Sequence, residues 1–175
     1  THLSQDMTAA ELSDFATEYR RRITAVAQAT GGIVDKFMGD AAMIVFEEGE
    51  DPAAAANACI DCAFRLRSEI AAWSQAREAA GAPPLRAGIG LHWGAVFSGV
   101  VGTPDRLEFS VFGDTVNAAA RLEQETKRLQ ADILASREIL QIAGKDRDGA
   151  PWDIAAETEL RGREGVLRLR GVRRS

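Results

Sequence analysis

A helix that leads directly into a pair of short strands is the feature that most constrains the fold of this chain. Thr8 and Glu11 have the spacing of a helix-capping box, and apolar residues then recur every three or four positions as far as Gly31-Gly32. Residues 33–38 and 41–46, rich in Ile, Val, Phe and Met, follow as two strands around a glycine turn. The pattern therefore predicts an amphipathic helix and a tight hairpin. The apolar positions of the helix are Leu12, Phe15, Tyr19, Ile23 and Val26.

Helices and strands continue to alternate along the rest of the chain. Asp51-Pro52 is expected to start a second helix that ends near Gly81. Residues 85–102 are interpreted as two strands that fold back on each other at Trp93-Gly94. This order favours an α+β sandwich, with helices against a mixed or antiparallel sheet. The remaining expected elements are a strand over 106–113, a helix over 115–129 capped by Asp114, a strand over 133–136, a helix over 136–143, and strands over 152–160 and 166–172.

Length and composition indicate one globular domain. The chain has 175 residues, 46% of them apolar and 27% charged, which is close to the average for globular proteins. It contains no run of about eighteen apolar residues and no basic-then-apolar signal pattern, so we expect a cytoplasmic domain. Because the chain starts with Thr1 rather than Met, we expect it to belong to a longer protein. The sequence leaves open a regulatory region or a membrane anchor ahead of Thr1.

The net charge of −5 is distributed unevenly. Residues 161–175 hold six Arg and one Glu, a net charge of +5, so residues 1–160 carry −10. A short basic segment on an acidic body suits a compact polyanion such as a triphosphate, whereas nucleic acid would need a broader basic face. We therefore expect no nucleic-acid partner. The other interpretation is that these arginines protect an exposed edge strand from pairing.

The cysteines and histidines do not form a metal site that the sequence can identify. Cys59 and Cys62 have CxxC spacing, but no second pair completes a tetrahedral zinc site. Since positions i and i+3 share one helix face, core packing in a reducing compartment is the favoured interpretation. His92 has no acidic partner at metal-ligand spacing, and we expect a structural role for it.

Two pairs of polar residues are candidates for chemistry. Lys36 and Asp40 flank the predicted hairpin turn, where Asp40 is able to bind a divalent cation, although one carboxylate alone is a poor magnesium site. The alternative is a surface lysine and a turn-stabilising aspartate. Asn117 and Arg121 are four residues apart and share one helix face, where a guanidinium suits phosphoryl oxygens and an amide suits a ring or hydroxyl oxygen. The alternative is an ordinary exposed helix face.

Three segments, in this order and spacing, resemble the catalytic domain of the class III nucleotidyl cyclases. They are GGIVDKFMGDAAMIVF, RAGIGLHWGAVFSGVVG and FSVFGDTVNAAARLE. Three ordered segments are far more specific than any one of them. The resemblance covers Thr1 to about Val172 and implies an α+β, ferredoxin-like βαββαβ sandwich with a C-terminal extension, with residues 1–175 as one catalytic domain. It also implies a head-to-tail homodimer with active sites at the interface.

The resemblance implies roles for the candidate residues. Lys36 and Ser110 match the positions that bind the base, and Asp40 matches a metal-binding aspartate. Asn117 and Arg121 match the pair that orients the ribose and stabilises the transition state. The family uses two Mg²⁺ or Mn²⁺ ions per active site. In such a dimer, Asp40 acts on one bound nucleotide while Lys36 acts on the other.

Two departures from the family pattern affect the expected site. Thr1 matches the last residue of the motif that holds the first metal-binding aspartate, so we expect the chain as given to lack that aspartate and the first strand, and to hold its metals poorly. Arg161, in the segment ELRG, takes the position of the family's triphosphate-binding lysine and keeps its charge while changing its shape.

The hydrogen-bonding polarity of the base decides the predicted substrate. Lysine only donates hydrogen bonds, and adenine presents an acceptor at N1 where guanine presents a donor. Lys36 therefore favours ATP, while the hydroxyl of Ser110 accepts or donates. We predict an adenylate cyclase that converts ATP into 3′,5′-cyclic AMP and pyrophosphate. The alternatives are a guanylate cyclase and a catalytically silent nucleotide-binding or dimerisation module.

Overall fold

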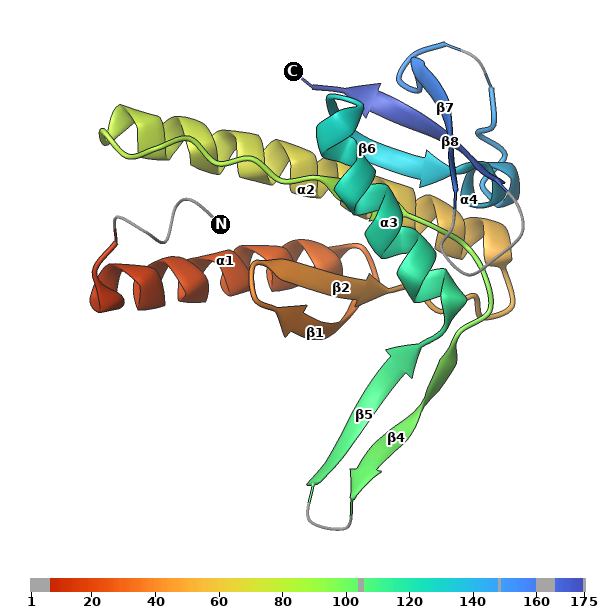
Figure 1. Cartoon of the computed structure of the whole chain (residues 1–175), viewed down its shortest axis with the longest axis horizontal. Coiled ribbons are helices and arrows are strands. Elements are labelled where there is room, and N and C mark those ends of the chain that lie inside the picture. The colour runs from red at the N-terminus through yellow and green to blue at the C-terminus, as the bar shows by residue number, and fades with distance from the viewer. Residues whose placement is uncertain (1–6, 104–105, 148, 160–165, 175) are drawn as a thin grey trace. The chain divides into compact units, whose positions relative to one another are not determined.

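The structure, a computed structural model, describes residues 7–103, 106–147, 149–159 and 166–174 (Figure 1). The chain divides into two compact units: unit 1 comprises residues 1–47 and 58–87, and unit 2 comprises residues 48–57 and 88–175. The elements are α1 (Ala9–Ala29), β1 (Ile33–Met38), β2 (Ala41–Val45), α2 (Pro52–Ala79), β3 (Ile89–Leu91), β4 (Phe97–Thr103), β5 (Arg106–Phe112), α3 (Asp114–Arg128), β6 (Ala131–Ser136), α4 (Arg137–Ile142), β7 (Ile154–Glu159) and β8 (Val166–Arg173).

Helix α1 of unit 1 begins with the predicted capping box. The Thr8 hydroxyl accepts a hydrogen bond from the backbone N–H of Glu11 at 3.3 Å, and the Glu11 carboxylate accepts one from the backbone N–H of Thr8 at 2.8 Å. These bonds satisfy two N–H groups that lack partners inside the helix. Ile23 and Ala27 are buried, whereas Leu12, expected on the inner stripe, is 40% exposed. From Phe15 onwards the predicted stripe is buried or half-buried, and Leu12 is its one exposed member.

The hairpin of β1 and β2 forms as predicted and rests on α1. The two strands pair antiparallel, and the register shifts between Val34 and Lys36, so that Asp35 is the extra residue of a β-bulge. The Phe37 ring lies edge-on to the Tyr19 ring of α1, with centroids 5.9 Å apart. These contacts fix the direction of the hairpin relative to α1.

Helix α2 also begins where the sequence predicts. The Asp51 carboxylate accepts a 2.9 Å hydrogen bond from the backbone N–H of Ala54, as an N-cap residue does. Farther along the helix, both cysteines are free thiols, and Cys62 is buried. Burial raises the pKa of the Cys59 thiol to about 12, so it stays protonated at neutral pH. The packing interpretation of the CxxC pair agrees with these features.

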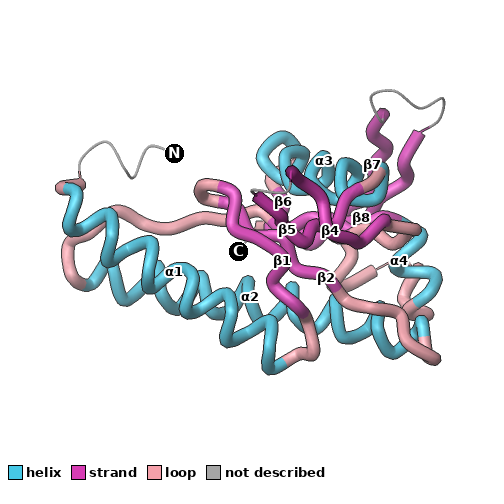
Figure 2. The backbone as a smooth tube through the Cα atoms, turned by 90° about the horizontal axis from the view of Figure 1, so that it is seen from below, coloured by secondary structure: helices cyan, strands magenta, loops and turns pink. Residues whose placement is uncertain are grey.

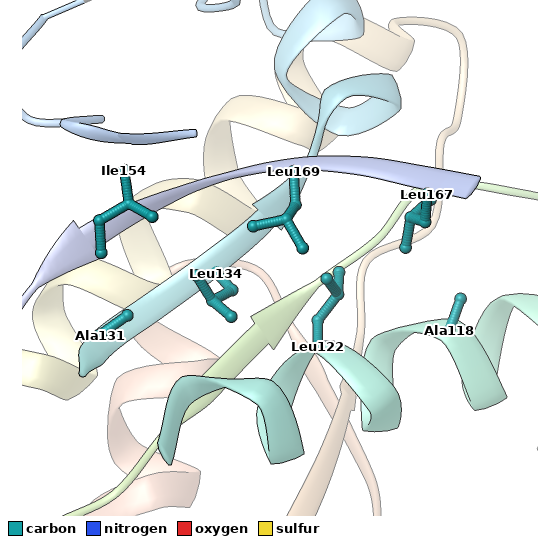
Figure 3. Close-up of a cluster of buried hydrophobic side chains, with 7 residues drawn as sticks. All are labelled: Ala118, Leu122, Ala131, Leu134, Ile154, Leu167 and Leu169. Atoms are coloured by element: carbon teal, nitrogen blue, oxygen red, sulfur yellow. The ribbon is translucent and has the colours of Figure 1, made fainter. Parts of the chain in front are cut away.

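Unit 2 contains a four-stranded mixed sheet in the order β3-β6-β8-β7. Strand β3 runs parallel to β6, while β8 runs antiparallel to both β6 and β7. Helix α3 packs against this sheet and closes a buried apolar cluster (Figure 3). The predicted α+β class, with a helix against a mixed sheet, is confirmed. The cluster consists of Ala118, Leu122, Ala131, Leu134, Ile154, Leu167 and Leu169.

Two glycines allow α3 to lie directly on the edge of this sheet. A Cβ atom at Gly90 would be 2.2 Å from the backbone oxygen of Ala119, and one at Gly88 would be 2.0 Å from the Thr126 hydroxyl oxygen. Any larger residue would therefore push the helix and strand apart. The sequence predicted that Gly88 and Gly90 belong to a hairpin over residues 85–102, whereas the structure places both against helix α3.

The predicted hairpin over residues 85–102 is wrong. Strand β3 pairs with β6, and β4 pairs antiparallel with β5 in a separate two-stranded ribbon (Figure 2). Within unit 2 this ribbon extends away from α3 and the four-stranded sheet (Figure 1). The error arose because β6 follows β3 only after β4, β5 and α3, and local pattern carries no information on such a distant partner.

The start of α3 also differs from the prediction. Asp114 is the first helical residue, and the N-cap is Gly113, which has φ of 143° and makes no side-chain capping bond. An aspartate in the first turn still interacts favourably with the helix dipole. The Thr115 hydroxyl donates a 2.6 Å hydrogen bond to the backbone oxygen of Ala95, which ties this turn to the segment before β4. Across the part of the chain that the structure describes, no helix is both long and apolar enough to span a membrane.

Candidate active site

The turn of the β1–β2 hairpin carries the first candidate pair. Lys36 lies in β1 with its side chain 25% exposed, and Asp40 lies in the turn and is exposed. The Tyr19 hydroxyl donates a 3.1 Å hydrogen bond to the backbone oxygen of Asp40. Burial, reinforced by the nearby Asp40 charge, raises the pKa of Tyr19 above its usual 10.0, so the phenol remains a neutral donor. The hydrogen bond from Tyr19 therefore holds the backbone of the turn in place, and the Asp40 residue remains exposed to solvent.

A second carboxylate lies beside Lys36. The Oδ2 atom of Asp35 is 3.5 Å from the Nζ atom of Lys36, and the Asp35 side chain is only 5% exposed. Among residues with described side chains, none gives this Oδ2 atom a hydrogen bond. Lys36 thus extends from the hairpin next to a buried negative charge.

Helix α3 presents the second candidate pair on one exposed face. Asn117 and Arg121 are separated by one helical turn, while Ala118 and Leu122 on the other side are buried in the core. The Nη2 atom of Arg121 is 3.2 Å from Oε1 of Glu125, and the Arg121 side chain is 43% exposed. Only the Arg121 end of this pair is exposed, because the Glu125 side chain is 10% exposed. Glu125 also pairs with Arg128, so a phosphoryl group that draws Arg121 away would leave the carboxylate with a cation beside it.

The remaining substrate-binding candidates lie in unit 2 or outside the described residues. Ser110 lies in β5, opposite Gly99 of β4, and is buried. It belongs to the same unit as Asn117 and Arg121, which follow it in the next element. Arg161 lies outside the described residues. The described candidates therefore divide into two residues of the β1–β2 hairpin in unit 1 and three residues of β5 and α3 in unit 2.

The described residues fit a divalent cation only in part. Where the structure describes side chains, no group of three or more His, Cys, Asp or Glu is placed to hold a metal ion. Asp40 offers one carboxylate oxygen, and Mg²⁺ is usually held by one or two carboxylates together with substrate phosphates and water. These residues thus supply one ligand rather than a complete metal site.

Sequence reasoning missed three residues that position the candidates. Tyr19 was assigned only to the apolar stripe of α1, yet it holds the Asp40 turn. Asp35 precedes Lys36 directly, but its burial follows from the bulge, which no sequence pattern predicts. Glu125 is four residues after Arg121, a spacing that could have suggested the ion pair.

A cavity of about 760 Å³ in unit 1 contains none of the candidate residues. It is lined by α1, the end of α2 and residues 82–84, and its aromatic pair, Phe15 and Trp73, is stacked with centroids 5.0 Å apart. The Arg77 guanidinium lies 5.2 Å from the Phe15 centroid, and that of Arg22 lies 5.2 Å from the Trp73 centroid. Because the chain's own cations cover both rings, the two rings are not open to a cationic ligand. Three carboxylates in its lining disfavour an anion.

The family follows from comparison with known proteins. The sequence model of the adenylate and guanylate cyclase catalytic domain matches residues 1–168. The chain therefore belongs to the adenylate and guanylate cyclase catalytic domain family. The resemblance carried by the three sequence segments is confirmed.

Individual relatives agree with this assignment. The adenylate cyclase of Anabaena cylindrica is 30% identical over 145 residues, which cover 81% of this chain and 28% of that protein. The chain thus spans little more than a quarter of the length of this relative. The crystal structure of the adenylyl cyclase CyaB from P. aeruginosa matches with a TM-score of 0.83 and 24% identity, over 99% of this chain and 88% of that one.

A guanylyl cyclase has nearly the same structural similarity. The crystal structure of the guanylyl cyclase Cya2 matches with a TM-score of 0.82 and 22% identity, over 98% of this chain and 84% of that one. At these identities the likeness concerns the fold alone. Because cyclases named for either base match equally well, the fold does not identify the nucleotide.

Proposed function

We propose that this chain is the catalytic domain of an adenylate cyclase that converts ATP into 3′,5′-cyclic AMP and pyrophosphate at a homodimer interface. The observation that carries the choice of ATP is Lys36, a donor-only side chain on a strand held against α1. Adenine offers N1 as an acceptor for such a donor, whereas guanine presents an N–H there. Ser110, whose hydroxyl either donates or accepts, is compatible with the adenine amine.

The reaction itself needs positioning more than covalent chemistry. The ribose 3′-oxygen attacks the α-phosphorus of the same molecule and pyrophosphate leaves, so the nucleophile and electrophile are already linked. In this proposal the Asn117 amide holds the ribose. Arg121 exchanges its contact with Glu125 for the α-phosphoryl group and offsets the charge that develops there.

A divalent cation, Mg²⁺ or Mn²⁺, is part of the proposal, with two ions per active site. Asp40 is the described residue that would bind a cation, because its carboxylate lies in the exposed turn held by Tyr19. When bound, such an ion neutralises phosphate charge and lowers the pKa of the attacking hydroxyl. Ligands beyond Asp40 would come from the triphosphate and from the aspartate that the family resemblance places ahead of Thr1. Arg161 is proposed to bind the triphosphate.

The proposed partner is a second copy of this chain. Among the side chains that the structure describes on the β4–β5 ribbon and at the residue just before it, four large apolar ones are exposed, and the rings of Phe97 and Phe112 lie 4.8 Å apart. Phe97 and Phe112 are paired across the two strands, and an exposed aromatic pair on an extended ribbon is typical of a surface that another protein covers. A dimer that buries it would place residues of both protomers at each active site. The exposed side chains are Val96, Phe97, Val100 and Phe112, which are 42%, 59%, 64% and 44% exposed.

One observation favours a second candidate function. Because the described carboxylates do not assemble a complete metal site, a catalytically silent nucleotide-binding or dimerisation module is the main alternative.

The proposed function is tested by incubating the chain, and a form extended to any aspartate encoded ahead of Thr1, with Mn²⁺ and either ATP or GTP. We expect cyclic AMP and pyrophosphate by mass spectrometry. Cyclic GMP alone would indicate a guanylate cyclase, and nucleotide binding without product would indicate the silent module.

A further inference from the structure

We propose that Asp35 is a positioning residue for base selection: its buried carboxylate holds the Lys36 ammonium in the place from which it binds adenine. This inference rests on the proposed function, which gives Lys36 that role. Asp35 is not one of the six candidate site residues, and in this proposal it does not itself touch the nucleotide. The six candidates are Lys36, Asp40, Ser110, Asn117, Arg121 and Arg161.

The β-bulge in β1 brings the two side chains together. In a regular strand, neighbouring residues point to opposite faces, so Asp35 and Lys36 would be directed apart. The register shift between Val34 and Lys36 makes Asp35 the extra residue of the bulge, and a bulge re-aims the side chains on either side of it. As a result, Oδ2 of Asp35 is 3.5 Å from Nζ of Lys36.

Burial makes this contact more than a surface ion pair. The Asp35 side chain is 5% exposed, and none of the side chains or backbone groups in the described ranges donates a hydrogen bond to its Oδ2 atom. A buried carboxylate without compensation is strongly disfavoured. The Lys36 ammonium is the cation that the structure places beside it, so the two charges hold each other in position.

This arrangement leaves the lysine able to bind a base. An ammonium group has three donors, so an ion pair with Asp35 is compatible with donation to N1 of adenine. A lysine side chain has four rotatable bonds, and restricting them before the nucleotide arrives lowers the entropy lost on binding. Removing the Asp35 charge should therefore weaken adenine binding while leaving contacts to the ribose and phosphates intact.

The test measures binding of 3′-deoxy-ATP and 3′-deoxy-GTP, which lack the attacking hydroxyl and cannot cyclise. Isothermal titration with Asp35→Asn should give about 10-fold weaker binding of the adenine analogue, the loss typical of one charged contact, and little change for the guanine analogue. Asp14→Asn is the matched control, because Asp14 is an exposed carboxylate on α1 of the same unit. This control should leave both dissociation constants unchanged.

A double variant separates positioning from a purely structural role. In the Lys36→Met background, Asp35→Asn should have no further effect on the ratio of the two dissociation constants. An equal loss for both analogues, or the same loss in both backgrounds, would overturn the inference. If Lys36→Met itself leaves the ratio unchanged, the base pocket of the proposed function fails instead.

Thermal unfolding of Asp35→Asn, compared with that of the unmodified chain, shows whether the variant folds. If Asp35→Asn does not fold, Asp35→Glu takes its place, because it keeps the charge and displaces it by one methylene group. The preference for the adenine analogue should then fall, and an unchanged preference would contradict the positioning role.

Discussion

The Arg121 guanidinium pairs with the Glu125 carboxylate, and the Arg121 side chain is 43% exposed. In the proposed reaction its contribution grows as charge develops on the α-phosphoryl group. Arg121→Ala should therefore reduce turnover by about 10²- to 10³-fold and affect nucleotide binding much less. Arg128→Ala, which also removes an ion pair to Glu125, is the matched control and should leave turnover near that of the unmodified protein. The measurement is steady-state kinetics with ATP, which gives kcat and KM separately. Equal losses in nucleotide binding and turnover would contradict the transition-state role of Arg121.

Base choice is a second property of single residues. The double substitution Lys36→Glu and Ser110→Cys replaces the donor at the base with an acceptor. The preference should move from ATP towards GTP, because guanine presents an N–H at N1. Product ratios from an equimolar mixture of the two nucleotides measure this shift. A ratio that stays the same would count against both residues as the base pocket.

Asp146 makes the stability of unit 2 sensitive to acid. Hydrogen bonds from Arg137 and Arg170 hold the pKa of Asp146 at about 2, below its usual 3.8. Its carboxylate therefore stabilises the folded state above about pH 4, and this contribution is lost as the pH falls towards 2. Asp146→Asn should cost about 1–2 kcal/mol at pH 7, allowing for solvent screening, and should flatten the dependence between pH 4 and 2.

The measurement for Asp146 is thermal unfolding as a function of pH. Asp61→Asn, which removes an exposed ion pair with Arg65, is the control and should change the melting profile little. A stability profile for Asp146→Asn that remains parallel to that of the unmodified chain would argue against this carboxylate as the source of the acid sensitivity.

At the scale of elements, local signals in the sequence predicted more than distant pairing. The capping box at Thr8 and the N-cap at Asp51 are decided by neighbouring residues, and both helices start as predicted. Strand β3 was assigned the wrong partner because its pairing with β6 depends on the whole of unit 2. The same limit applies to the site: residue types and spacings identified the candidates, but not the contacts from Tyr19 and Asp35 that hold the hairpin pair.

The close packing of α3 on β3 gives a prediction for Gly90. Gly90→Ala would place a methyl group against the Ala119 backbone oxygen, where no flexible side chain can yield. We expect a loss of about 1–3 kcal/mol in stability, together with lower cyclase activity, because α3 carries the proposed catalytic pair. Gly49→Ala, with φ of +55° in open space, should cost about 1 kcal/mol and spare activity. Chemical denaturation and turnover of both variants test this, and equal effects on activity would contradict it.

At the scale of the whole molecule, the proposed active site requires two copies of the chain. The candidate residues fall in two units, and the family resemblance implies that Asp40 serves one nucleotide while Lys36 serves the other. We propose that Arg121 serves the same nucleotide as Lys36. Nothing in the sequence of a single chain specifies how two copies associate. The exposed apolar side chains of the β4–β5 ribbon became apparent only from the structure, since the sequence alone assigned β4 to the wrong hairpin.

Mixing two inactive variants tests the shared active site most directly. In a mixed dimer of Asp40→Asn and Arg121→Ala, one site carries both defects and the other carries none. Activity on ATP should return to about a quarter of the unmodified level, because random pairing yields half mixed dimers with one intact site each. A mixture of Asn117→Ala and Arg121→Ala should stay inactive, since both residues lie on α3 of one protomer and each site then keeps one defect. No recovery with the first pair, or equal recovery with both, would contradict a site built from two protomers.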